Sequence, residues 1–94
     1  MDISNLPEEN SDLYAIYPNP ARSQFTVSTP ELTEEYILFD VYDLQGNLVK
    51  TNRQKINKKH QYVISGDSLL SGLYVIRIRS NSRLLALRKL VIIQ

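Results

Sequence analysis

Short segments in which apolar and polar residues alternate fill most of this chain, and no segment has the spacing of an amphipathic helix. In the clearest segment, residues 23–28, Phe25 and Val27 fall on one face of an extended chain and polar residues on the other. Turn residues separate these segments at regular intervals. Strands are expected at residues 13–17, 23–28, 36–43, 48–54, 60–65, 73–80 and 84–94. About seven short strands favour an all-β fold, an immunoglobulin-like antiparallel β-sandwich.

The length of the chain fits one domain. Its 94 residues and its hydrophobic content of 43% are enough for one core. Residues 1–13 are polar and acidic, which predicts a flexible linker, and residues 14–94 predict the folded domain. The chain has no cysteine, which excludes disulfides and thiolate metal sites.

Nothing in the chain looks like a membrane span or a signal peptide. No apolar run approaches the roughly 20 residues that cross a bilayer, and the acidic beginning of the chain is unlike a signal peptide. Two alternatives therefore stay open: a cytoplasmic domain, or a piece of a longer exported protein whose signal lies upstream.

Charge is distributed unevenly. Residues 1–40 contain eight acids and one base, whereas residues 41–94 contain ten bases and two acids. Such asymmetry can mark binding to nucleic acid or to an anionic surface. In a sandwich, however, early and late strands become neighbours, and opposite charges pair across them. We favour pairing and expect no nucleic-acid partner, because Tyr74 is in phase with Ile76 and Ile78 and belongs to a core rather than to a stacking platform.

Residues that carry enzyme chemistry are scarce. The single histidine, His60, lacks the nucleophile and carboxylate of a hydrolytic triad, so we expect a partly exposed strand residue and no enzyme activity. Glu31, Glu34 and Glu35 share one connection, but calcium needs roughly six to eight converging oxygens, so a solvated loop is favoured. No cofactor or metal is expected.

The sequence Tyr-Pro-Asn-Pro at residues 17–20 is the most rigid part of the chain. Both prolines fix φ and donate no hydrogen bond, so this segment does not fit a central strand. It predicts a stiff, extended crossing between the sheets, with the Asn19 amide bonded to a neighbouring backbone. A second local signal, Gly46 in residues 43–47, predicts a hairpin turn with positive φ.

The last predicted strand is apolar on both faces. Leu90 and Ile92 would face one side, and Val91 and Ile93 the other. Such a strand is either buried on both sides or presents one apolar face to a partner. Its main chain would also be available at a sheet edge, so that it could add to a partner's sheet or pair in a homodimer.

Four motifs, in this order and spacing, resemble the C-terminal sorting domain (type A) of cargo proteins of the type IX (Por) secretion system of Bacteroidota. They are YPNP, VYDLQGNLV, LLSGLYVIRI and RKLVIIQ, and the resemblance covers about residues 14–94. Carried onto this chain, it implies the following recognition residues: Pro18, Asn19, Pro20, Gly46, Gly72, Leu73, Tyr74, Lys89, Leu90, Val91, Ile92 and Ile93.

The resemblance also implies a role in export. It implies a sandwich carried behind a larger cargo domain, absent from this chain, with a signal peptide upstream in the parent protein. The domain would be recognised in the periplasm by the outer-membrane translocon. A sortase-like protease would cleave within residues 1–13, and the cargo would be attached to lipopolysaccharide at the cell surface or released. The alternative is a stand-alone immunoglobulin-like binding or adhesion module, since only a short segment follows Met1 before the first strand.

Overall fold

A computed structural model describes residues 13–81 and 83–94, so the predicted linker (residues 1–13) lies outside this description except for Leu13. The described residues form seven strands and no α-helix, as the alternation predicts. The strands are β1 (Ala15–Tyr17), β2 (Gln24–Ser28), β3 (Tyr36–Tyr42), β4 (Leu48–Lys55), β5 (Gln61–Ser65), β6 (Gly72–Ser80) and β7 (Arg83–Ile92).

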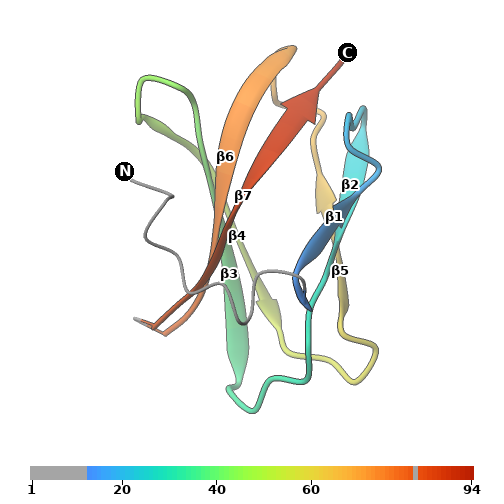
Figure 1. The fold of residues 1–94 in the computed structure, drawn as a ribbon, viewed down its shortest axis with the longest axis vertical. Helices are drawn as coiled ribbons and strands as arrows, with labels where there is room; N and C mark the ends of the chain where they lie inside the picture. The colour runs from blue at the N-terminus through green and yellow to red at the C-terminus, as the bar shows by residue number, and fades with distance from the viewer. Residues whose placement is uncertain (1–12, 82) are drawn as a thin grey trace.

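The strands form two sheets that face each other (Figure 1). The smaller sheet has the order β1-β2-β5, and the larger has the order β4-β3-β6-β7. All neighbouring strands within the sheets are antiparallel. Because the chain passes from one sheet to the other three times, early and late segments lie side by side. The predicted immunoglobulin-like sandwich is confirmed.

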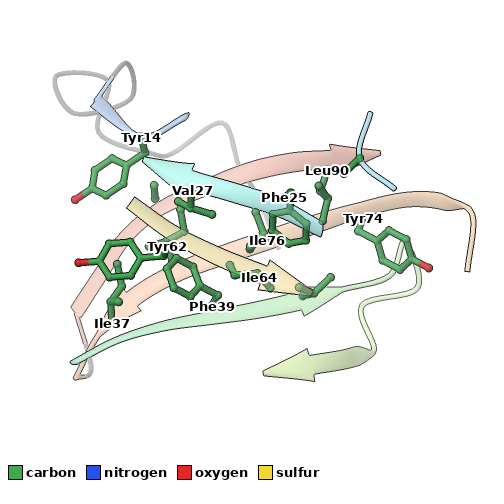
Figure 2. Close-up of a cluster of buried hydrophobic side chains, with 14 of the residues drawn as sticks. Tyr14, Phe25, Val27, Ile37, Phe39, Tyr62, Ile64, Tyr74, Ile76 and Leu90 are labelled. Carbon is green, nitrogen blue, oxygen red and sulfur yellow. The ribbon is translucent and has the colours of Figure 1, made fainter. Parts of the chain in front are cut away.

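The core lies between the sheets and consists of the residues that the alternation assigns to inner faces. Phe25 and Val27 of β2 are fully buried, and so are Ile76 and Ile78 of β6. In Figure 2 the rings of Phe39 and Tyr62 pack against each other across the two sheets, with centroids 5.7 Å apart. Burial of these side chains is the main favourable contribution to the stability of the fold.

Asp40 of β3 departs from the simple alternation. It faces outward, as expected, yet it is only 1% exposed. Arg77 Nε and Nη2 donate to Asp40 Oδ2 at 3.1 and 2.9 Å, and Arg79 Nε donates at 2.7 Å. Burial raises the pKa of Asp40, but the hydrogen bonds from Arg79 and Arg77 outweigh it, so the pKa lies below its ordinary value.

A second ion pair joins early and late segments. Arg83 Nε donates to Glu34 Oε2 at 3.1 Å, and Arg83 Nη2 donates to the same oxygen. The hydrogen bond from Arg83 lowers the pKa of Glu34. The ion pairs of Asp40 join the neighbouring strands β3 and β6, and the Glu34–Arg83 pair joins the connection before β3 to β7, so for these residues opposite charges of early and late segments do pair.

Candidate recognition surface

The proline segment lies along the outer edge of β7. Both the Tyr17–Pro18 and the Asn19–Pro20 peptide bonds are cis. Asn19 Nδ2 donates to the carbonyl of Lys89 at 3.0 Å, and Asn19 Oδ1 accepts from the Val91 N–H at 2.9 Å. The prediction that the Asn19 amide binds a neighbouring backbone is confirmed, and that backbone belongs to the last strand.

Ala21 extends this contact. Its N–H donates to the carbonyl of Val91, and its carbonyl accepts from the N–H of Ile93, both at 2.8 Å. The two segments run parallel, with Ala21 bridged to Ile92. We name residues 19–21, bonded in this way to residues 89–93, the edge clasp.

The edge clasp corrects one expectation. The main-chain groups of the last strand were expected to be available to a partner, but the clasp occupies them between Lys89 and Ile93. Leu90 and Ile92 are fully buried, while Ile93 is 41% exposed and Val91 is half-buried. At this edge a partner can therefore contact outward side chains more readily than backbone.

The motif Gly72, Leu73 and Tyr74 begins β6 and pairs directly with the same part of β7. The register joins Gly72 to Ile92, Leu73 to Val91 and Tyr74 to Leu90. Tyr74 is buried, and its hydroxyl donates to the carbonyl of Leu70 at 2.6 Å. Leu73 is 41% exposed. Three motifs that are distant in sequence thus meet in one place.

Gly46 lies at the same end of the larger sheet, in the turn between β3 and β4 (Figure 1). Its φ of 87° confirms the predicted positive-φ position. The Asp43 carboxylate holds this turn, because its Oδ1 accepts from the N–H groups of Gln45 and Asn47 at 3.0 and 2.9 Å. Strand β6 lies between this turn and β7, the strand to which the edge clasp is bonded.

Three further residues of these motifs, Tyr42, Leu48 and Val75, are not among the recognition residues that the sequence implies, yet they lie on the same outer face. Tyr42 pairs with Leu48 and Val75, and Val75 pairs with Lys89, so these side chains form a row across the outer face of the larger sheet. We name the whole set the motif-end face: Tyr42, Leu48, Leu73, Val75, Lys89, Val91 and Ile93. The alternation in the sequence could have predicted this face. Leu73 and Val75 alternate in phase with the charged Arg77 and so point outward, whereas Tyr74, Leu90 and Ile92 point into the core.

The candidate residues for catalysis and calcium binding do not form a site in the described residues. His60 lies in the turn before β5, half-buried and with a φ of 59°, and its N–H donates to Asn57 Oδ1 at 2.8 Å. Glu34 is bound to Arg83, away from any grouping for calcium. In residues 13–81 and 83–94 no cluster of three or more histidines or carboxylates could hold a metal. The same part of the chain contains no helix of the length and hydropathy needed to cross a bilayer.

Comparison with known families gives a match. Residues 15–94 match the family described as secretion system C-terminal sorting domain. Comparison with curated proteins and with solved structures gives no match. The family match spans all seven strands and every residue of the edge clasp and the motif-end face.

Proposed function

Because the chain belongs to the family of type IX secretion C-terminal sorting domains, we propose that the motif-end face, held in place by the edge clasp, is the surface that the outer-membrane translocon recognises. The domain is a sorting signal of a secreted protein, which is exported to the cell surface or the medium, and its family is not one of enzymes. One observation carries the proposal: three motif segments are bonded side by side. Residues 72–74 pair with residues 90–92 in the sheet, and Asn19 of residues 18–20 bonds to the main chain of Lys89 and Val91.

The composition of the motif-end face supports recognition by side chains. Leu73 and Ile93 are each 41% exposed, and Leu48 is 54% exposed. The half-buried Val75 and Val91 are next to Leu73, Val75 on the same strand and Val91 opposite it on β7. Apolar side chains gathered on an otherwise charged surface are typical of protein–protein contact sites. Lys89 adds one positive charge to this row, so the partner surface should be apolar with a nearby acid.

We further propose that a sortase-like protease separates the cargo from the domain within residues 1–13, before β1. The parent protein would carry a signal peptide and cross the periplasm before the translocon reads the domain. Family membership supports this order of events. Mass spectrometry of the exported cargo would identify the cleaved bond, and an exported cargo that still carried residues 14–94 would contradict the cleavage.

An export assay tests the proposal. A fluorescent reporter with a general secretory signal is fused ahead of residues 1–94 and expressed in a type IX-competent host and in a translocon-deficient host. We expect reporter at the surface or in the medium of the competent host alone. Reporter retained in the periplasm of both hosts would contradict the sorting function and would favour the stand-alone binding module.

The surface itself is tested by a double variant, Val91→Thr with Ile93→Thr, which keeps β-branched side chains but makes them polar. We expect at least a tenfold loss of exported reporter, corresponding to about 1.4 kcal/mol or more of binding free energy. Leu84→Thr is the matched control, since Leu84 is 47% exposed at the opposite end of β7. Equal export of the double variant and the control would show that the translocon reads another surface.

A further inference from the structure

The backbone of β4 forms an open sheet edge. The Ile56 N–H donates to the Glu35 carbonyl at 2.9 Å, at the end of the ladder between β3 and β4. In an antiparallel ladder, residues that bond to the neighbouring strand alternate with residues whose N–H and C=O point away from it. Thr51, Arg53 and Lys55 therefore direct their main-chain groups away from β3. In the described part of the chain, no hydrogen bond reaches these groups.

The other sheet edges are shorter or already occupied. The edge clasp covers β7 between Lys89 and Ile93. On β5, the carbonyl of Val63 accepts from Gln54 Nε2 at 3.0 Å. Strand β1 has only three residues, whereas β4 has eight. The longest open edge in the described residues is thus on the side of the larger sheet opposite the edge clasp.

All charged side chains on and just after β4 are positive. No acid occurs between Asp43 and Asp67. The bases of this stretch are Lys50, Arg53, Lys55, Lys58 and Lys59. The ion pairs of the described residues use arginines of β6 and β7 instead. The Arg53 guanidinium lies 4.0 Å from the centre of the Tyr36 ring, on the outer face of the sheet.

We propose that β4 is a docking edge for an extended acidic segment of another protein, which adds to the larger sheet as a fifth strand. Hydrogen bonds to Thr51, Arg53 and Lys55 would hold the backbone of the segment, and its alternate side chains would supply specificity. Acids on the outer face of that segment would lie opposite Arg53 and Lys55. This inference goes beyond the sorting function and does not depend on it.

The same charges make a second copy of this chain an unsuitable partner. If β4 paired with β4 of another copy, bases would lie opposite bases, which destabilises strand pairing. Positive side chains on edge strands are a known means of preventing self-association. An acidic strand would instead place carboxylates opposite the bases of β4, so the charge of this edge favours an acidic partner over a second copy.

The first test uses a short peptide in which glutamate alternates with threonine, added to the isotope-labelled domain. We expect slower hydrogen exchange at the amides of Thr51, Arg53 and Lys55, and an affinity that falls as salt rises. A peptide with glutamine in place of glutamate should bind about tenfold more weakly, because it lacks the two charge pairs. Equal binding of both peptides, or no binding of the acidic peptide, would overturn the proposal.

The second test separates strand addition from attraction to any anion. Arg53→Gln removes the charge, and Arg53→Pro removes the charge together with the outward N–H, which the β3–β4 ladder does not use. We expect the proline variant to bind about tenfold more weakly than the glutamine variant. Equal affinity of the two variants, or polyphosphate binding as tightly as the peptide, would show a general anion-binding surface instead.

Lys55→Pro and Lys55→Gln repeat this comparison at the end of β4, in case Arg53→Pro does not fold. Circular dichroism and thermal unfolding identify the folded variants. Sedimentation of the free domain checks for self-association, and a dimer that forms through β4 would overturn the choice of an acidic partner.

Discussion

The side-chain amide of Asn19 makes the two hydrogen bonds to β7 that the backbone of a neighbouring strand would make. Its donor and acceptor reach the Lys89 carbonyl and the Val91 N–H, the groups that a neighbouring backbone would use. We expect Asn19→Ala to lower the free energy of unfolding by about 1–2 kcal/mol, since two hydrogen bonds are lost at an exposed edge. Urea unfolding measures the change. The adjacent control is Arg22→Ala, at an exposed side chain, and equal stability of the two variants would contradict the role of Asn19.

Of the two glycines among the recognition residues, only Gly46 has a backbone conformation that favours glycine. A Cβ on Gly72 would meet its nearest atom, Tyr74 Cε2, at 3.8 Å, which is an ordinary contact, whereas Gly46 has a φ of +87°. We expect Gly72→Ala to change stability by less than about 0.5 kcal/mol and Gly46→Ala to cost about 1 kcal/mol. Thermal unfolding compares them. A large loss of stability in Gly72→Ala would show that packing, and not recognition, requires this glycine.

Asp40 makes stability depend on pH. Its folded pKa is lowered, so its contribution is complete above the unfolded value of about 3.9 and is lost as the pH falls through the folded value. We expect Asp40→Asn to cost about 2–3 kcal/mol at neutral pH, because Arg77 and Arg79 lose their shared anion. Urea unfolding at several pH values should show this difference shrinking below about pH 4. A difference that did not change with pH would contradict the ion pairs as its source.

At the scale of elements, β7 combines two roles on alternate residues. Leu90 and Ile92 belong to the core, and Val91 lies on the motif-end face. We therefore expect removal of residues 88–94 to abolish folding as well as export, because both core side chains and the edge clasp are lost. Circular dichroism and the dispersion of amide resonances would show this. A truncated domain that stayed folded would contradict it.

Strand positions could be predicted because local signals determine them. Gly46 and the polar residues around it end β3 and begin β4, and the alternation of Phe25 with Val27 identifies the inner face of β2. The burial of Asp40 could not be predicted, since it depends on arginines 37 and 39 residues away. The amide of Asn19 could be expected to bind backbone, but its partners lie 70 and 72 residues away. Local patterns carry no information on such distances.

For the whole molecule, the order of strands predicts where the fold opens first. Among the strands that the structure describes, β3 and β6 are paired on both sides, whereas β1 pairs only with β2 and β4 pairs only with β3. We expect amide hydrogen exchange to be slowest in β3 and β6 and fastest in β1 and at Thr51, Arg53 and Lys55. Exchange that was equally slow at these three amides would show that β4 is covered in the free domain.

The candidate site was predictable only as a set of separate motifs. Four short sequences were identified, but their arrangement depends on the parallel contact of Ala21 with Ile92, which no local pattern encodes. The same holds for the motif-end face, since Tyr42 and Val75 belong to two separate motifs and become neighbours only through the sheet register.

The edge clasp joins the first part of the domain to the last. Residues 19–21 are bonded only after residues 89–93 have been made and have taken their place in the sheet. A chain that is still being synthesised, or one shortened by proteolysis before Lys89, cannot form this end of the molecule. If the translocon binds this end of the domain, as we propose, it would bind only chains whose last strand is complete, and no separate check of chain length would be needed.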